Sequence, residues 1–270
     1  MSQANQQAIA ALDDNTRARG FALTLRWTAA AARLLDCLGN DLVGLFGGGT
    51  FRVATVVNGP IQTNTYIVVS QDHAVMIDPA WEGEKLAERF SALFPAAHLD
   101  AVVCTHGHAD HIGGVAGVRR ALGEDTPFMI SALDAPHLAE AVRSMKLTWG
   151  IDTEMPPAPD RLLEEGDTIK VGDVCLQVLS TPGHTPGGIV LFVATADANI
   201  AFVGDTLFPG GHGRVDLPGG DEGLIMRSLA RIGTSLPADT LCYVGHNGTT
   251  TVARELDSNP FMAYALRHER

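Results

Sequence analysis

The segment Thr105-His-Gly-His-Ala-Asp-His111 concentrates four potential metal ligands, His106, His108, Asp110 and His111, in six consecutive positions. An apolar, strand-like run ends just before it at residue 104, and a helical pattern begins at residue 114. Neutral imidazoles are good ligands for zinc or iron, and a carboxylate supplies negative charge near the cations. Little except metal binding gathers these groups so tightly, although a polar loop that happens to be rich in His is the alternative for this segment alone. We therefore expect a fold that holds a metal-binding loop at a strand end.

Three further side chains fit the same plan, because His184, Asp205 and His246 each follow an apolar, strand-like run at a turn containing glycine. Each is a weaker signal alone, since a single His after a strand is more often structural and an Asp in such a turn usually forms the turn. Loops at strand ends commonly hold polar groups at the rim of a rigid core. With the segment above, they supply five imidazoles and two carboxylates, enough for two metals that share a bridging carboxylate.

From residue 51 onward, short β-rich runs alternate with amphipathic helical patterns. Connections of both hairpin and crossover length favour an α/β sandwich over a regular doubly wound sheet. Strands are expected at 51–57, 65–70, 74–77, 101–104, 127–130, 174–179, 189–193, 200–203 and 241–244, and helices at 82–93, 114–122, 136–146, 222–232 and 250–256.

The first 50 residues have a different pattern and are rich in Ala and Leu. Leu34, Leu38, Leu42 and Leu45 recur at helical spacing, and three consecutive glycines at 47–49 end the run. We therefore predict an N-terminal helical extension over residues 1–50 and a catalytic domain over residues 51–270. The extension carries no recognisable chemistry, and we expect it to dock on the domain or to form a homo-oligomer.

In their order along the chain, the motifs resemble those of the metallo-β-lactamase superfamily. The resemblance covers about residues 51–262 and rests on Thr-His-x-His-x-Asp-His, Thr-Pro-Gly-His-Thr-Pro-Gly, Gly-Asp-Thr-Leu-Phe and Gly-His. It implies an αββα sandwich of two mixed β-sheets flanked by helices, with the metals at one edge of the sheets. Residues 202–208, residues 213–221 and the ending Asn259-Pro-Phe261 are similar to the single-domain glyoxalase-II-like (hydroxyacylglutathione hydrolase-like) metallohydrolases.

This resemblance implies how the seven candidate ligands divide between two metals, and it makes Asp110 and Asp205 the catalytic carboxylates. A further carboxylate, Asp78, is implied to orient a metal-binding His, since such an outer acceptor fixes the tautomer of the imidazole. Arg214 and Asp216 are expected to form a structural ion pair. The implied ligands are His106, His108 and His184 for one metal and Asp110, His111 and His246 for the other, with Asp205 bridging.

The activity implied is that of a binuclear hydrolase cleaving a thioester, with hydroxyacylglutathione as the substrate type, by attack of a metal-bridging hydroxide. We expect two divalent metals, zinc in the first place and iron or manganese otherwise. A thiolate leaves readily, so the reaction needs no dedicated protein acid. Only 24 residues follow His246. We therefore expect no counterpart of the helical region that binds glutathione in two-domain relatives, which leaves the acyl thioester open.

Three other functions stay open. The nearest competitor is a persulfide dioxygenase, in which a single iron would be held by His106, His184 and Asp205 and would bind O₂ at its open positions. A lactonase or esterase matches the downstream motifs less well. A non-catalytic module of the same fold is the non-enzymatic alternative.

Some positions lie outside the ligand set. Asn247 and Gly211-His212 differ from the usual family pattern, which concerns the substrate pocket rather than the metals. His212 lies in a loop near Asp205 and is the one further histidine of interest. The remaining histidines have no motif context and are expected on the surface: His73, His98, His137 and His268.

Composition limits the partners. The formal net charge is -12, which disfavours binding to phosphate backbones, so we expect a small-molecule substrate and no nucleic acid. The most apolar stretch, residues 21–46, is interrupted by charged residues, and no secretory signal begins the chain, so we expect no membrane association and a cytoplasmic location. Cys104, Cys175 and Cys242 lie in strand-like runs without a C-x-x-C motif, which favours buried thiols.

Overall fold

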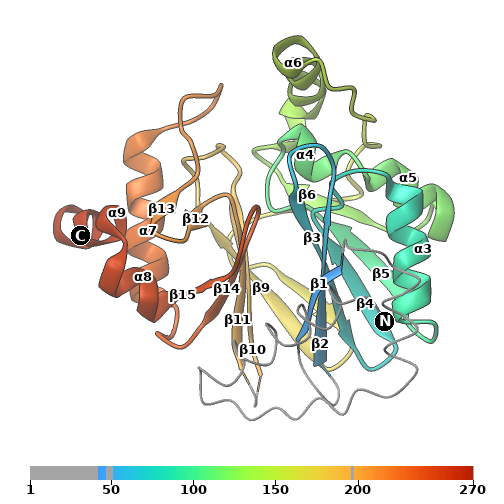
Figure 1. Ribbon diagram of the computed structural model, residues 1–270, viewed down its shortest axis with the longest axis horizontal. Helices are drawn as coiled ribbons and strands as arrows, with labels where there is room; N and C mark the ends of the chain where they lie inside the picture. Colours follow the sequence, from blue (N-terminus) through green and yellow to red (C-terminus); the bar gives the residue numbers. More distant parts are fainter. Residues whose placement is uncertain (1–41, 47–50, 196–197, 270) are drawn as a thin grey trace, which may run out of the picture. The chain divides into compact units, whose positions relative to one another are not determined.

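The computed structural model describes residues 42–46, 51–195 and 198–269, and most of its strands form two β-sheets (Figure 1). The larger sheet runs in the order β1 (Leu42–Phe46), β2 (Phe51–Asn58), β3 (Thr63–Ser70), β4 (His73–Ile77), β5 (His98–Val103), β6 (Phe128–Ser131) and β7 (Arg161–Leu163). The smaller runs in the order β15 (Thr250–Thr251), β14 (Leu241–Val244), β11 (Asn199–Gly204), β10 (Ile189–Ala194), β9 (Val174–Ser180) and β8 (Thr168–Val171). The short strands β12 (Leu207–Phe208) and β13 (Gly211–His212) pair separately.

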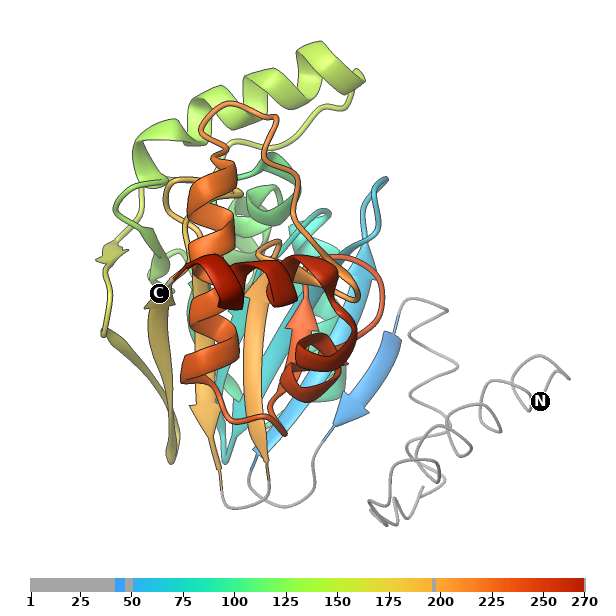
Figure 2. The same ribbon diagram turned by 90° about the vertical axis from the view of Figure 1, so that its left-hand side faces the viewer.

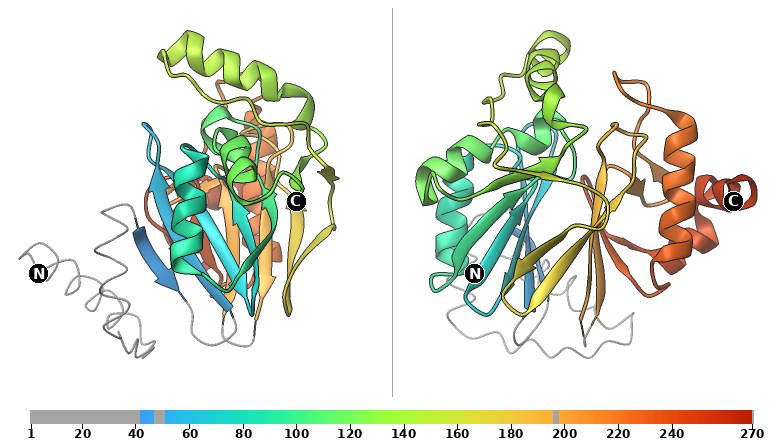
Figure 3. Two further views of the ribbon diagram at one scale, coloured as in Figure 1. Left: turned by 90° about the vertical axis from the view of Figure 1, so that its right-hand side faces the viewer. Right: turned by 180° about the vertical axis from the view of Figure 1, so that it is seen from behind.

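Helices cover the outer face of each sheet (Figures 2 and 3). Over the larger sheet lie α3 (Gly83–Leu93), α4 (Ala109–Ile112) and α5 (Val115–Leu122), and α6 (Leu138–Trp149) follows a 3₁₀ turn at Ala135–His137. Over the smaller sheet lie α7 (Glu222–Ser235), α8 (Val252–Ser258) and α9 (Pro260–His268). One apolar cluster fills the space between the sheets, and two more lie beneath the helices. The fold is the αββα sandwich of two mixed sheets that the sequence predicts.

Strand β3 illustrates why both faces of the larger sheet are apolar. Tyr66 and Val68 point into the layer between the sheets, whereas Ile67 and Val69 pack beneath the helices. Successive side chains of a strand point to opposite faces, so a strand covered on both sides needs a continuous apolar run. Each such fully buried side chain stabilises the fold by roughly 1.5–3 kcal/mol.

An aromatic group joins the two sheets close to the edge where the ligands are expected. The ring of Tyr66 lies 5.2 Å from that of Phe202 and 5.1 Å from that of Tyr243, measured between centroids. The Tyr66 hydroxyl donates a hydrogen bond to the carbonyl oxygen of Val244. Burial raises the pKa of Tyr66 well above its ordinary value, so the hydroxyl keeps its proton. This contact fixes the end of β14 two residues before His246.

The strands that precede the candidate ligands end at a common edge within each sheet. In the larger sheet β4 and β5 are parallel. In the smaller sheet β11 and β14 are parallel, and β9 has the same direction because both β9 and β11 are antiparallel to β10. Parallel strands bring their carboxyl ends to one edge of a sheet. The loops after β9, β11 and β14 therefore lie together, as do those after β4 and β5.

Strand β1 corrects part of the prediction for the N-terminal segment. The sequence predicts a helix that reaches Leu45, but Leu42–Phe46 forms a strand antiparallel to β2. Four leucines at helical spacing are a weak signal, and pairing with the edge of an existing sheet outweighs it. Residues 1–41 and 47–50 lie outside the described part of the chain, so the rest of the predicted helical extension and the homo-oligomer stay predictions.

Other differences are local. The sequence predicts neither β7 nor β8, because runs of three or four residues carry little periodicity. It also misses α9, although Asn259 caps this helix and Pro260 begins it, which is a known start signal. Cys104 and Cys242 are buried as expected, but Cys175 is exposed because the side chains of β9 alternate between the two faces.

Among the described residues, no helix is long and apolar enough to cross a membrane.

The close packing of α3 against α5 generates a prediction about stability. A Cβ atom on Gly83 would lie 2.1 Å from the carbonyl oxygen of Gly114, so Gly83→Ala should push the helices apart and cost about 1–3 kcal/mol. The matched change Gly233→Ala, inside α7, meets only the flexible ends of Leu256, Met262 and Leu266 and should be neutral or stabilising by up to about 1 kcal/mol. Denaturant unfolding measures both, and equal effects would contradict this account of the packing.

Candidate metal centre

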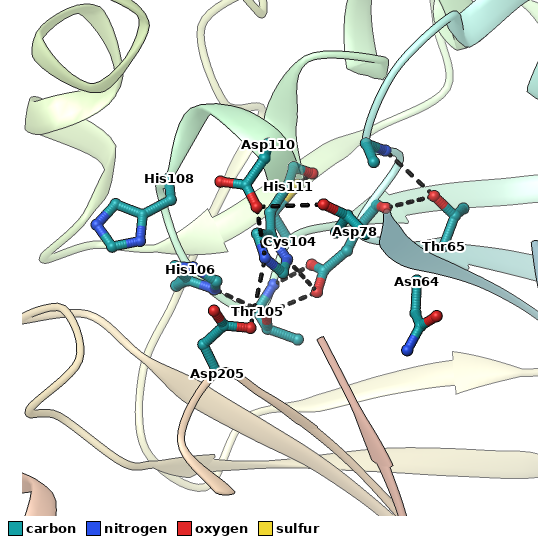
Figure 4. A network of polar contacts seen from close by, with 12 residues as sticks. Asn64, Thr65, Asp78, Cys104, Thr105, His106, His108, Asp110, His111 and Asp205 are labelled. Carbon is teal, nitrogen blue, oxygen red and sulfur yellow. Dashed lines mark hydrogen bonds and ion pairs between the residues drawn. The ribbon is translucent and has the colours of Figure 1, made fainter. Parts of the chain in front are cut away.

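The structure brings together all seven candidate ligands from five segments of the chain, and Figure 4 shows part of the set. The loop after β5 carries His106 and His108, α4 carries Asp110 and His111, and the loops after β9, β11 and β14 carry His184, Asp205 and His246. Their ligand atoms form three overlapping groups, and within each group all atoms lie within 4.8 Å of one another. The groups are His106, His108 and His184; His106, His111 and Asp205; and Asp110, His111 and His246.

The three-histidine group consists of His106, His108 and His184. Nδ1 of His108 lies 2.9 Å from Nε2 of His184, a distance at which two imidazoles share a proton or face one cation. Nδ1 of His184 lies 2.7 Å from the carbonyl oxygen of Arg214. Because a carbonyl only accepts, this nitrogen carries the proton, and Nε2 of His184 is left with the lone pair that a metal ligand needs.

The carboxylate-rich group consists of Asp110, His111 and His246. Oδ2 of Asp110 lies 3.3 Å from Nε2 of both histidines and accepts a hydrogen bond of 3.2 Å from the Thr63 hydroxyl. Asp205 stands between the two groups. Its Oδ1 lies 3.5 Å from Nε2 of His111, and its Oδ2 lies 3.5 Å from Nε2 of both His184 and His246. Asp205 therefore occupies the position of a carboxylate that can reach both groups.

Asp78, which follows β4, orients two of the imidazoles from behind. Its Oδ2 lies 3.0 Å from Nδ1 of His111 and accepts a hydrogen bond of 2.7 Å from the Thr105 hydroxyl. Its Oδ1 accepts from the backbone N–H of Thr105 at 2.6 Å. The Thr105 hydroxyl, having donated to Asp78, accepts from Nδ1 of His106 at 3.1 Å. Both outer nitrogens are thus protonated, which leaves Nε2 of each ring to face the centre.

Three buried polar atoms of the centre lack a hydrogen-bond partner, which tests whether a metal fits here. Among the described residues, Nε2 of His106, Nε2 of His111 and Oδ1 of Asp205 are buried without a hydrogen bond. Buried polar groups are nearly always paired, so unpaired atoms pointing at one place indicate a missing partner. All three atoms are lone-pair donors of the types that zinc and iron bind. The residues therefore fit one or more divalent metal ions.

The electrostatics differ between the two groups. Burial lowers the pKa of His106 well below its ordinary value, and burial together with the nearby His184 lowers the pKa of His108 to about 4. Burial also lowers the pKa of His111, but Asp110, Asp205 and Asp78 outweigh it and raise the pKa well above the ordinary value. In the protein without metal, these shifts keep His106 and His108 neutral and favour a proton on His111. A cation can take the place of that proton.

Two glycines allow the loops to approach this closely. A Cβ atom on Gly245 would lie 1.9 Å from Oδ1 of Asp205. A Cβ atom on Gly213 would lie 1.9 Å from the carbonyl oxygen of Asp205 and 2.9 Å from Nδ1 of His184. Glycine is required where a side chain would displace a functional group.

Other residues named by the sequence contribute less. Arg214 and Asp216 form the expected ion pair, with both contacts at 2.7 Å and both side chains about half exposed or more. The ring of His212 packs against Phe261 of α9 at 4.5 Å between centroids. His73, His98, His137 and His268 are exposed as predicted. Sequence reasoning missed Asp134, which lies in a turn after β6 and contacts two of the ligand loops.

Removing the charge of Asp78 should weaken metal binding. In Asp78→Asn, the amide cannot accept hydrogen bonds on both sides, so His111 and Thr105 lose a partner and the apparent metal affinity should fall about 10- to 100-fold. The matched control Asp100→Asn changes a carboxylate that contacts His73 and His98 near the surface. Metal content after dialysis against a metal buffer measures both. An Asp78→Asn protein with full metal content would contradict the orienting role.

Filling the space at Gly245 should have a similar effect by displacing a ligand. In Gly245→Ala the new methyl group overlaps Oδ1 of Asp205, so metal affinity should fall on the order of 10- to 100-fold. Gly248→Ala is the matched control in the same loop, since a Cβ atom there meets nothing within 4 Å. Titration with Zn²⁺ in competition with a chelator measures the affinity. Equal affinities for the two variants would show that Asp205 does not need this space.

Comparison with known proteins points to a family of metal-dependent enzymes, as the cluster of potential metal ligands does. Residues 58–246 match the family model described as the metallo-beta-lactamase superfamily. The chain is 36% identical over 207 residues to the probable metallo-hydrolase YqgX of Bacillus subtilis, covering 76% of this chain and 94% of that protein. It is 32% identical over 193 residues to the hydroxyacylglutathione hydrolase GloC of Haemophilus influenzae, covering 71% of this chain and 88% of that protein.

Two solved structures are similar to this chain in both sequence and fold. The crystal structure of TTHA1623 in a di-iron-bound form is 38% identical, with a TM-score of 0.68 over 77% of this chain and 98% of that chain. The crystal structure of ETHE1 from Myxococcus xanthus is 26% identical, with a TM-score of 0.61 over 82% of this chain and 92% of that chain. From the αββα sandwich, the cluster of seven side chains at its edge and these matches, we conclude that the chain belongs to the metallo-β-lactamase superfamily.

Proposed function

We propose that this protein is a binuclear metal-dependent hydrolase that cleaves a small acyl thioester of the hydroxyacylglutathione type. The observation that carries the proposal is that two of the three ligand groups share no residue, and that Asp205 lies 3.5 Å from a histidine of each. His106, His108 and His184 would hold one divalent metal, and Asp110, His111 and His246 the other. A site for one metal would leave one of these groups without a role.

The bound metals would lower the pKa of a water molecule toward neutrality and polarise the substrate carbonyl. The chain's own residues hold this arrangement in place. Asp205 and Asp110 present carboxylate oxygens to the centre, and Thr63 donates to Oδ2 of Asp110, which restricts its rotation. Asp78 keeps the protons of His106 and His111 on the outer nitrogens, directly for His111 and through Thr105 for His106.

Thioester cleavage suits a site with these residues. A thiol has a pKa of about 8.5, so a thiolate is a good leaving group near neutral pH and needs no proton from a protein acid. The seven side chains include no Lys, Tyr or Glu that could serve as such an acid. The likeness to the hydroxyacylglutathione hydrolase GloC supports this substrate class. Zinc is our first expectation for the metal, and the di-iron form of TTHA1623 supports iron as the alternative.

A persulfide dioxygenase is the second candidate function. His106 and Asp205 belong to one potential metal group, and Nε2 of His184 lies 3.5 Å from Oδ2 of Asp205, so two histidines and one carboxylate could hold a single iron. The likeness to ETHE1 fits this alternative equally well. The hydrolase is favoured because Asp110, His111 and His246 form a second group that a single iron does not use.

Changing either of two ligands should abolish thioester hydrolysis. Asp205→Ala removes the carboxylate between the groups and His184→Ala removes one imidazole, so turnover should fall by at least about 100-fold while the fold is retained. His98→Ala, an exposed histidine, is the matched control. Release of thiol from a panel of acyl thioesters, with metal content measured on the same samples and circular dichroism for the fold, gives the result.

Two outcomes would overturn the proposal. Near-normal hydrolysis by either variant with reduced metal content would show that the metals are not needed. One iron per chain, together with oxygen uptake on a persulfide and no thioester cleavage, would establish the dioxygenase instead.

A further inference from the structure

Asp134 is a buried carboxylate that joins the two loops of the three-histidine group. It lies in the turn after β6 and is 2% exposed. Its Oδ2 accepts hydrogen bonds of 2.8 Å from the backbone N–H of Gly107 and from the Thr185 hydroxyl. Its Oδ1 accepts from the backbone N–H of Gly187 at 2.6 Å. One side chain from a third segment therefore holds the loop after β5 and the loop after β9 at a fixed separation.

The donors to Asp134 are the immediate neighbours of the histidines. Gly107 stands between His106 and His108, and Thr185 follows His184 directly. A tether one residue away leaves little freedom for the adjacent side chain. The approach is also tight, since a Cβ atom on Gly187 would lie 2.6 Å from the backbone nitrogen of Asp134. Charge-assisted hydrogen bonds of this kind are stronger than neutral ones, which suits a contact that sets position.

His108 depends on this tether more than its neighbours do. Its ring makes one hydrogen bond within the described residues, from Nδ1 to His184 across the centre. His106 and His184, by contrast, are each held from behind, by Thr105 and by the carbonyl oxygen of Arg214. The position of His108 is therefore set by its backbone, and Asp134 holds that backbone through Gly107.

The carboxylate-rich group makes no use of Asp134 among the described residues. Asp78 contacts His111 directly, and Thr63 contacts Asp110. Within the described residues, the side-chain hydrogen bonds of Asp134 all go to the two loops of the three-histidine group. Asp78 also reaches His106 through Thr105, so it supports both groups, whereas Asp134 supports the three-histidine group. A change at Asp134 should therefore leave the carboxylate-rich group in place.

We propose that Asp134 is a positioning residue that sets the separation of His108 and His184 and thereby the metal affinity of the three-histidine group alone. This inference rests on the ligand assignment of the proposed function. It predicts that a change at Asp134 alters the metal affinity of the three-histidine group and leaves the affinity of the carboxylate-rich group unchanged.

Zn²⁺ titration of the full-length, metal-free chain against a chromophoric chelator tests the proposal. The wild type should bind two ions. His246→Ala leaves the three-histidine group intact, and in this background Asp134→Asn should weaken the remaining site about 10- to 100-fold. His108→Ala leaves the carboxylate-rich group, and in that background the same change should have little effect. Asn is chosen because it keeps the shape but cannot accept from all three donors.

Two further variants separate positioning from general stability. Thr185→Val removes one of the three donors, so it should weaken the same site by less than Asp134→Asn does. Asp160→Asn is the matched control, because Asp160 accepts from the backbone N–H of Phe128, at the opposite end of β6 from Asp134, and pairs with Arg119. It should lower the melting temperature without changing either Zn²⁺ affinity.

Each outcome decides a different claim. If the wild type binds two ions and Asp134→Asn weakens both sites in parallel with a fall in melting temperature, Asp134 is only structural and the inference is wrong. The inference is equally wrong if Asp134→Asn changes neither site. If the wild type binds fewer than two ions, the ligand assignment itself fails, and the proposed function fails with it.

Discussion

The burial of three carboxylates among imidazoles is the constraint on which the rest of this structure depends. Asp78, Asp110 and Asp205 have side chains that are at most 11% exposed. Among the described residues, the ion-pair partners of these three are histidines rather than Lys or Arg. Unbalanced buried charge costs several kcal/mol per ion, so three buried carboxylates favour bound cations in place of the proton that His111 holds in the metal-free protein. Two divalent metals would more than balance it and leave positive potential for an anionic transition state.

The scaffold meets this requirement by holding each ligand from behind. Strands of equal direction bring the loops to one edge, and hydrogen bonds to outer nitrogens or to adjacent backbone then fix the rings. Glycines at the closest approaches leave room for the carboxylates. A site whose ligands are fixed before the metal arrives loses less conformational freedom on binding. The sandwich therefore serves the chemistry chiefly by supplying a rigid edge.

The sequence predicts the metal ligands better than it predicts the residues that hold the ligand loops in position. Ligands such as His106 and His246 are recognisable because each follows an apolar run at a glycine turn. Strands of equal direction then bring the loops that carry these ligands to one edge of the sheets. Asp134 carries no such signal, since an Asp after a strand usually forms a turn and its partners are remote in sequence. The strand at Leu42–Phe46 was hidden for a related reason: its pairing with β2 is a tertiary contact that local spacing cannot reveal.

Anomalous diffraction from crystals of the metal-loaded protein, collected on both sides of the metal's absorption edge, tests the central claim most directly. The account predicts two peaks. One should lie about 2.0–2.3 Å from the imidazole nitrogens of the three-histidine group, and the other at a similar distance from Asp110, His111 and His246, with Asp205 reaching both. A single peak at full occupancy, held by His106, His184 and Asp205 alone, would contradict it.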